Sequence, residues 1–228
     1  MPQQIPGVYP VSFSSRPVTA AFSGREFPAA KRNSFLNQIQ IEPEKIQWVR
    51  QVHGAGIILA DAENPIDPMP EADGLIVNSP GMALGILTAD CVPVFFWDPM
   101  QEVAGLAHAG WRGLKAGIIS KIVQRLRQEF ESKPSTLQVA LGPAIRSCCY
   151  EVGEEFKEFF PDFYIQSMVP GKGHVDLLGA AKAELTAAGV PAPLIWDSGI
   201  CTSCQNARFF SARKEKTLER IASVIQLR

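Results

Sequence analysis

Three residues with metal-binding side chains stand at the ends of apolar segments of this chain. His53 follows such a segment in "RQVHGAG", Cys91 interrupts "LTADCVPVFFWDP", and His108 ends "VAGLAHA". If these segments are neighbouring strands that end on one side of a sheet, the three side chains converge there. Imidazole and thiolate are ligands that zinc favours, and three protein ligands leave a fourth position for water or substrate. The residues therefore predict a metal site, although their spacing matches no short metal-finger pattern.

Each of these residues also has an ordinary structural interpretation when taken alone. Free cysteine is among the most buried residue types, so Cys91 can be a small core residue beside a turn. Its neighbour Asp90 can be an acid/base group of a reaction or a carboxylate that orients a ligand histidine. Adjacent residues of a strand point to opposite faces, so adjacency to Cys91 does not decide between these roles.

A glycine-flanked turn follows His108 in "HAGWRGLKAG" and leads into a helix that we expect to begin near Leu114. Backbone amides at Gly110 and Gly113, together with the Arg112 guanidinium, can bind an anionic substrate group such as phosphate. The turn has neither the Walker spacing nor the dinucleotide-binding spacing. The alternative is that the glycines only allow the turn to pack closely.

The remaining cysteines and the third histidine carry weaker signals. Cys201 and Cys204 form a C-x-x-C motif, which can be redox-active or half of a metal knuckle. No second C-x-x-C accompanies it, and the adjacent pair Cys148 and Cys149 is a poor candidate for a shared tetrahedral site. We therefore expect these four cysteines to pack and to line a pocket, and we expect His174 at the surface or at a pocket rim.

The elements that position these residues indicate an α+β fold, with a mixed β-sheet core flanked by helices, in one domain over residues 1–228. Runs rich in Val, Ile, Leu and Phe predict strands at 46–50, 55–60, 74–78, 82–87, 92–97, 103–108, 136–141, 193–197 and 221–227. Apolar spacing predicts helices at 114–131 and 176–188, the latter capped by Asp176 and ended by Gly189. We expect short helical turns near 30–39 and 152–160 and a surface loop at 62–74.

Composition excludes several classes of partner. A net charge of −1 gives no electrostatic reason to bind nucleic acid or an acidic membrane. No apolar run reaches membrane-spanning length, and five cysteines are too few for a disulfide scaffold at this size. We therefore expect a cytoplasmic monomer with reduced thiols and a small-molecule substrate.

Several motifs closely resemble the YfiH-type laccase-domain family. They are "QVHG", "ADGLIVNSPGMALGILTADCVPVFFWDP", "GLAHAGWRGLKAGI", "LGPAIRSCCYEVGEE", "VDLLGAA" and "GICTSCQNARFFSARKE". The family was first described as polyphenol oxidases and is now regarded as purine nucleoside phosphorylases with adenosine deaminase activity. Its fold is shared with the cytotoxic necrotizing factor catalytic domain. The resemblance implies a catalytic zinc at His53, Cys91 and His108, with copper as the historical alternative.

The same resemblance implies the substrates. Adenosine, inosine, guanosine or methylthioadenosine would react with phosphate, and adenosine would also be deaminated by a metal-activated water. The chain departs from the family near its start, where "SFSSRPVTAAFSGREF" keeps Arg16 as a substrate-binding residue but lacks the usual double glycine. It departs again near its end, where "SARKEKTLER" replaces a Tyr-containing motif.

Three other functions compete with this one. The first is a cysteine- or zinc-dependent amidase acting on peptidoglycan precursors, with Cys91 as a nucleophile activated by His108. The second is copper-dependent phenol oxidation, which a site with one Cys and two His does not favour. The third is a binding module stabilised by zinc, which an open ligand position argues against.

Overall fold

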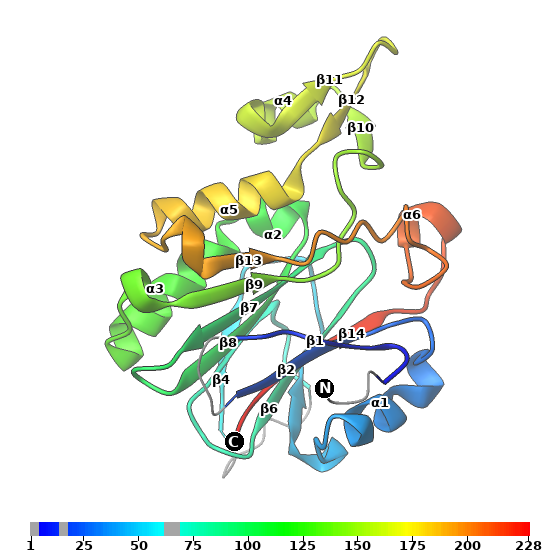
Figure 1. Cartoon of the computed structure of the whole chain (residues 1–228). Helices are drawn as coiled ribbons and strands as arrows, with labels where there is room; N and C mark the ends of the chain where they lie inside the picture. The colour runs from blue at the N-terminus through cyan, green and yellow to red at the C-terminus, as the bar shows by residue number, and fades with distance from the viewer. Residues whose placement is uncertain (1–4, 14–17, 62–68) are drawn as a thin grey trace.

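Two large mixed β-sheets pack face to face in the computed structural model, which describes residues 5–13, 18–61 and 69–228 (Figure 1). The strand order of the five-stranded sheet is β1 (Val8–Pro10), β2 (Val18–Ser23), β14 (Ile221–Leu227), β6 (Ala83–Thr88) and β3 (Ile46–Trp48). That of the six-stranded sheet is β13 (Ile195–Asp197), β9 (Gln138–Leu141), β7 (Val92–Asp98), β8 (Val103–Ala109), β5 (Gly74–Val77) and β4 (Ile57–Ala60).

The central strands are apolar on both faces because both faces are covered. On β7, Phe95 and Trp97 pack between the two sheets, whereas Val94 and Phe96 pack against helices on the outer face. All four side chains are fully buried. A strand covered on both sides has no solvent-facing positions, which is why this segment reads as a continuous hydrophobic run and does not alternate.

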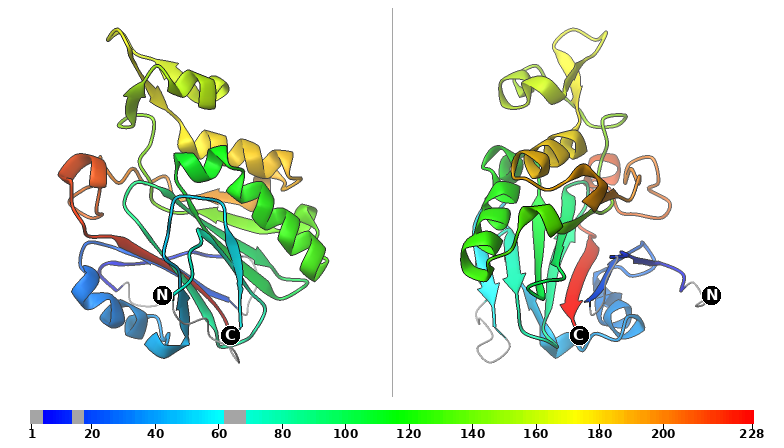
Figure 2. Two further views of the ribbon diagram at one scale, coloured as in Figure 1. Left: turned by 180° about the vertical axis from the view of Figure 1, so that it is seen from behind. Right: turned by 60° about the vertical axis from the view of Figure 1, so that its left-hand side comes forward.

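Helices cover the outer faces of the two sheets. The outer face of the six-stranded sheet is covered by α3 (Ile118–Phe130) and α5 (Leu177–Ala187), and that of the five-stranded sheet by α1 (Arg32–Gln38). The two groups of helices therefore lie on opposite sides of the paired sheets (Figure 2). No helix of the described residues is long and apolar enough to cross a bilayer.

The single helix expected at 114–131 is wrong, because the structure has two helices there. Helix α2 (Trp111–Lys115) begins three residues earlier than expected, and α3 begins after Gly117. Gly117 has a φ of 73°, a left-handed conformation that glycine adopts without steric cost and that ends the first helix. Arg112 therefore lies within the first turn of a short helix and not in a loop before one.

A small sheet and an N-terminal hairpin went unpredicted. The small sheet has the order β10 (Glu151–Gly153), β12 (Lys172–Val175), β11 (Tyr164–Gln166), and it projects beyond α5 together with α4 (Phe156–Phe159) (Figure 1). The unpredicted hairpin is β1 with β2. The nine expected strands are all present within a few residues, so the expected α+β class is confirmed. Residues 62–68 of the expected surface loop lie outside the described residues.

The other helical elements are the helix predicted at 176–188 and several short ones. The cap and the end expected for the 176–188 helix are confirmed, since the Asp176 carboxylate accepts from the Gly179 amide and Gly189 follows with a φ of 95°. Helix α6 (Ala212–Glu215) lies in the connection between β13 and β14, here called the β13–β14 connection (residues 198–220). Single turns of 3-10 helix span Ala29–Lys31, Pro43–Lys45, Pro134–Thr136, Pro161–Phe163 and Ala192–Leu194.

Candidate functional site

His53, Cys91 and His108 come together at one end of the six-stranded sheet. Their ligand atoms all lie within 4.8 Å of one another. The two imidazole rings meet edge to face, with centroids 4.8 Å apart. Cys91 immediately precedes β7, and the β7–β8 register pairs Pro93 with His108, so adjacent strands bring the thiol to the imidazole. The three side chains form one group that can hold a metal ion.

Asp73, which the sequence analysis did not single out, fixes both histidines. It is fully buried just before β5, and its Oδ1 lies 2.7 Å from His108 Nδ1. Its two oxygens also accept hydrogen bonds from the backbone amides of Val52, His53 and Gly54 at 2.7 to 3.2 Å. Because Nδ1 of His108 is engaged, its Nε2 is the nitrogen left for a metal. The signal in the sequence was an acidic residue directly before an apolar strand.

The three ionisable groups polarise one another. Burial raises the pKa of the Cys91 thiol, but hydrogen bonds and positive charge from His108 and His53 outweigh it, and the pKa falls to about 6. Burial lowers the pKa of His108, but Asp73 and Cys91 outweigh it and raise the pKa to about 9. Burial also raises the pKa of Asp73, and its bonds with His108 and the backbone bring it below its usual value. Without metal, the group therefore favours a thiolate beside an imidazolium.

The two glycines of the following turn are required by close packing. A methyl group at Gly110 would lie 2.9 Å from Cys91 Sγ, and one at Gly113 would lie 3.0 Å from the Gly54 carbonyl oxygen. Both glycines are buried. This packing explains both glycines without a bound anion, which was the alternative given for them above.

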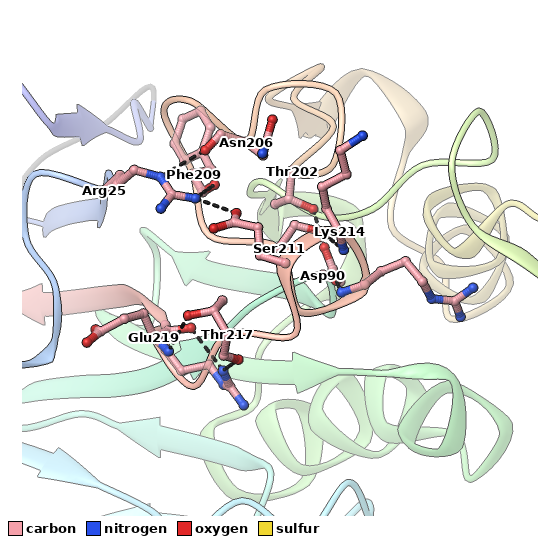
Figure 3. A network of polar contacts seen from close by, with 12 residues as sticks. Arg25, Asp90, Thr202, Asn206, Phe209, Ser211, Lys214, Thr217 and Glu219 are labelled. Atoms are coloured by element: carbon pink, nitrogen blue, oxygen red, sulfur yellow. Dashed lines mark hydrogen bonds and ion pairs between the residues drawn. The ribbon is translucent and has the colours of Figure 1, made fainter.

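The Asp90 carboxylate is bound by the β13–β14 connection. The φ of Asp90 is 91°, and its carboxylate accepts from the Thr202 hydroxyl at 2.6 Å and from the Arg213 amide at 2.7 Å. Figure 3 shows this anchor on one side of the connection and Arg25 on the other. Arg25 donates to the carbonyls of Asn206 and Phe209. In this arrangement Asp90 holds a wall of the site, and the carboxylate that orients a ligand histidine is that of Asp73.

The predicted anion-binding arginine lies beside the site and not in its cavity. Arg112 is exposed, with its guanidinium 4.4 Å from the centre of the Trp111 ring. Arg213 lies 5.0 Å from the Tyr150 ring, and both arginines act electrostatically on Tyr150 together with Cys91 and Asp90. Burial is the main reason that the pKa of Tyr150 rises to about 12. Residue 16, the expected substrate-binding arginine, lies outside the described residues.

A cavity of about 360 Å³ opens beside the three metal-binding side chains. This volume is within the usual range for small-molecule sites. Arg220, which the sequence analysis did not select, lines the cavity from the end of the β13–β14 connection, and its Nη1 donates to the carbonyls of Thr217 and Glu219. The cavity is lined by Val49, Gln51, His53, Leu87, Ala89, Cys91, His108, Ala212 and Arg220.

The expectation that the pair Cys148 and Cys149 has poor geometry for a shared tetrahedral site is wrong. The sulfur atoms of Cys148, Cys149, Cys201 and Cys204 all lie within 4.8 Å of one another. A parallel bridge between Ala144 and Cys201 brings the two segments together, although they are more than fifty positions apart. Separation in sequence gave no sign of this pairing. His174 is half-buried on β12, and its Nδ1 atom has no hydrogen-bond partner in the structure.

Comparison with known proteins identifies relatives over most of the chain. The purine nucleoside phosphorylase YlmD of Geobacillus stearothermophilus is 38% identical over 186 residues, which cover 75% of this chain and 68% of that protein. Adenosine deaminase RL5, from an unknown prokaryotic organism, is 33% identical over 197 residues, covering 80% and 75%. The crystal structure of YlmD superposes with a TM-score of 0.86 and 29% identity over 92% of each chain.

The family model described as multi-copper polyphenol oxidoreductase laccase matches residues 25–228. The matched region contains every described residue of the candidate site. The resemblance drawn from the sequence motifs is thereby confirmed, and this chain belongs to the laccase-domain family, in which relatives carry the names purine nucleoside phosphorylase and adenosine deaminase.

Proposed function

We propose that this protein is a metal-dependent enzyme that acts on purine nucleosides. It would cleave adenosine, inosine, guanosine or methylthioadenosine with phosphate to give the free base and the sugar 1-phosphate. It would also convert adenosine and water to inosine and ammonia. The observation that carries the proposal is a three-ligand group, His53, Cys91 and His108, opening onto a cavity of small-molecule size. The names of relatives at 33–38% identity support the substrate class.

Zinc is the metal that best fits this group. One sulfur and two imidazole nitrogens suit zinc, and the buried Asp73 carboxylate on His108 is the kind of partner that raises ligand basicity. A zinc ion there would supply a Lewis acid that polarises substrate oxygen or water. Cys91 already favours the thiolate that a metal requires.

The protein's own residues would then orient the substrates. The side-chain amide of Gln51 is held by two hydrogen bonds to the backbone of Leu87, both 2.8 Å long, so this part of the cavity wall is fixed. Arg220 lines the cavity and is our preferred phosphate-binding residue. Arg112, predicted from the sequence for the same role, would contribute only at the entrance. Phosphorolysis requires that water be excluded from the reacting sugar carbon. The apolar residues that line the cavity, such as Val49, Leu87 and Ala212, would exclude it.

Assaying the two reactions side by side tests this assignment. Phosphorolysis and deamination would be followed separately by resolving adenine, hypoxanthine and inosine. The proteins compared would be zinc-loaded wild type, Arg220→Ala, Arg112→Ala and Arg127→Ala. Loss of a charged hydrogen bond to phosphate costs about 1.5–3 kcal/mol, or roughly ten- to over a hundredfold in kcat/KM. We expect that loss in phosphorolysis for Arg220→Ala, with deamination much less affected.

The exposed Arg127 of α3 is the matched control, and its replacement should change neither reaction. Equal losses of both reactions in Arg220→Ala would mean that Arg220 supports the fold or the metal ligands and does not bind phosphate. Failure of zinc-loaded wild type to turn over any purine nucleoside would contradict the proposed function itself.

A cysteine-dependent amidase acting on peptidoglycan precursors is the second candidate function. The observation that favours it is the sequence of contacts Cys91, His108 and Asp73, since a nucleophile, a base and an orienting carboxylate in this order can perform acyl transfer without metal. The metal content of protein purified without added metal separates the two. About one zinc ion per chain that is lost in His53→Ala supports the phosphorylase and deaminase, whereas no such loss, together with a readily alkylated Cys91, supports the amidase.

Copper-dependent phenol oxidation has less support. The chain has three histidines in all, and one of them, His174, lies on the separate small sheet. A multicopper cluster needs more imidazole ligands than this chain can supply.

A further inference from the structure

A second group of metal-binding side chains lies outside the site described above. The four-cysteine cluster consists of Cys148, Cys149, Cys201 and Cys204, and it contains every cysteine of the chain except Cys91. Sulfur–sulfur distances are 3.8 Å for Cys148–Cys149, 3.7 Å for Cys148–Cys201, 3.6 Å for Cys148–Cys204 and 3.4 Å for Cys149–Cys204. Cys201 is buried, Cys149 is half-buried, and the other two are exposed.

These distances match a tetrahedral metal site and not a disulfide. With a zinc–sulfur bond of about 2.3 Å, a regular tetrahedron has sulfur atoms about 3.8 Å apart. A disulfide would bring two sulfurs to about 2.05 Å, which none of the four measured pairs approaches. The other two pairs lie within 4.8 Å, so one metal ion at the centre of the four sulfurs would need shifts of no more than about 1 Å.

The backbone around the cluster is fixed independently of any metal. Ala144 receives a hydrogen bond from the Thr202 amide at 3.0 Å and donates its own amide to the Ile200 carbonyl at 3.3 Å. Arg146 binds both carboxylate oxygens of Asp197 at 2.8 and 2.9 Å. These contacts hold the turn before Cys148 against the turn that carries Cys201, so the ligands are brought together before a metal binds.

The surroundings of the buried sulfur suit a thiolate. The backbone N–H groups of Cys204 and Arg146 both hydrogen-bond to the sulfur of Cys201. Amides directed at a sulfur stabilise its negative charge, which is the charge state that a metal requires. The arrangement is that of a metal knuckle built on the C-x-x-C motif, completed by an adjacent cysteine pair from a distant turn.

We propose that the four-cysteine cluster is a structural zinc site, separate from the group formed by His53, Cys91 and His108. Four thiolates fill the coordination sphere of zinc, so the site has no open position for substrate. Its effect would be to tie the turn at 146–149 to the β13–β14 connection. That connection contacts Asp90 through Thr202 and Arg213 and lines the cavity through Ala212. The second metal would therefore stabilise a wall of the candidate active site.

Metal counting in ligand variants tests this proposal. Each protein would be purified under reducing conditions from zinc-supplemented cells and measured by inductively coupled plasma mass spectrometry. The variant His53→Ala/Cys91→Ser disables the first site and leaves the cluster intact, so its zinc content depends on the cluster alone. We expect about one zinc ion per chain in this variant and about two in wild type. Adding Cys204→Ser should abolish the remaining zinc, whereas the neighbouring control Ser147→Ala should not change it.

Spectroscopy and thiol labelling give readouts that do not depend on whether the cluster variants fold. Cobalt bound to His53→Ala/Cys91→Ser should give intense thiolate-to-metal charge-transfer bands and the d–d bands of tetrahedral coordination. Maleimide should label Cys148 and Cys204 slowly in the metal-loaded protein and rapidly after chelation. A His53→Ala/Cys91→Ser protein that folds but binds no zinc would overturn the proposal. So would disulfides in the reduced preparation, or labelling that chelation does not change. The assays of phosphorolysis and deamination test the proposed function separately from these results.

Discussion

Replacing Asp73 by asparagine removes one charge and exchanges one oxygen for an NH₂ group. The contacts of Asp73 show which hydrogen bonds would be lost in either orientation of the amide. Each carboxylate oxygen accepts two hydrogen bonds: Oδ2 from Val52 and Gly54, and Oδ1 from His53 and His108. An asparagine therefore leaves both the Val52 and Gly54 amides facing an NH₂ group in one orientation, and the His53 amide in the other, where the His108 ring can change to an acceptor. At about 1–3 kcal/mol for each buried donor without an acceptor, we expect a loss on the order of 1–6 kcal/mol in the free energy of unfolding.

The substitution should weaken metal binding in either orientation of the amide. If the NH₂ group faces His108, the ring must accept at Nδ1 and carry its proton on Nε2, which then cannot bind a metal. If it faces Val52 and Gly54, the turn that carries His53 is displaced. Loss of such an orienting partner weakens metal affinity by roughly 10–100-fold. A competition titration of zinc against a chromophoric chelator measures this, with near-ultraviolet circular dichroism to establish that the variant is folded.

Asp98→Asn is the matched control. Asp98 is also a fully buried carboxylate, but it lies at the opposite end of β7 from Cys91, and its Oδ2 has no partner. An asparagine there can place its NH₂ group at the unpaired position and keep the bonds from Met100 and Gln101. Zinc affinity in Asp98→Asn should equal that of wild type. If Asp73→Asn also binds zinc as tightly as wild type, the role assigned to Asp73 is refuted.

Three further predictions follow from contacts around the sheet end. In metal-free protein, the rate of Cys91 alkylation should rise with pH through a midpoint near 6, because the thiolate forms there. Bound zinc should suppress the alkylation at every pH. A midpoint near 9 would contradict the contacts of Cys91 with His108 and His53. Gly110→Ala should lower zinc occupancy with little change in fold, since its methyl group would lie 2.9 Å from the Cys91 sulfur; full occupancy by metal analysis would count against that close packing. Burial raises the pKa of Asp197, but Arg146 and Lys182 outweigh it and hold that pKa well below its usual value, so the stabilisation exists above about pH 4 and is lost as pH falls. Asp197→Asn should therefore flatten the acid side of the stability–pH curve from denaturant titrations, and an unchanged slope would exclude this linkage.

Much of the fold could be predicted because the signals are local. The strand from Val92 to Asp98 is apolar at nearly every position, and the Asp176 cap and Gly189 end need only a few residues to be recognised. Part of the metal-binding group could be predicted because Cys91 directly precedes, and His108 lies near the end of, two strands that pair with each other, whereas His53 follows β3 of the other sheet. His108 and Cys91 are separated by a single strand pair, so placing the strands side by side also places the ligands.

The features that went unpredicted depend on contacts between distant segments. The role of Asp73 can be recognised only when the turn at 52–54 is folded over it. Its carboxylate accepts hydrogen bonds from backbone amides of that turn and contacts the His108 ring. Arg220 reaches the cavity from the end of a long connection with no regular pattern. The four-cysteine cluster joins two turns through a bridge at Ala144, and the spacing of Cys149 and Cys201 gives no hint of it.

The position of β14 has a consequence for how the protein is made. Residues 221–227 form an interior strand of the five-stranded sheet, hydrogen-bonded to β2 on one side and to β6 on the other. The Ala222 amide donates to the Ser23 hydroxyl, 199 positions earlier. While the ribosome still holds these residues, the sheet has a gap between two strands and an apolar face that nothing covers. The nascent chain therefore cannot complete the five-stranded sheet piece by piece, and closing this sheet requires contacts between residues about 200 positions apart, which form slowly.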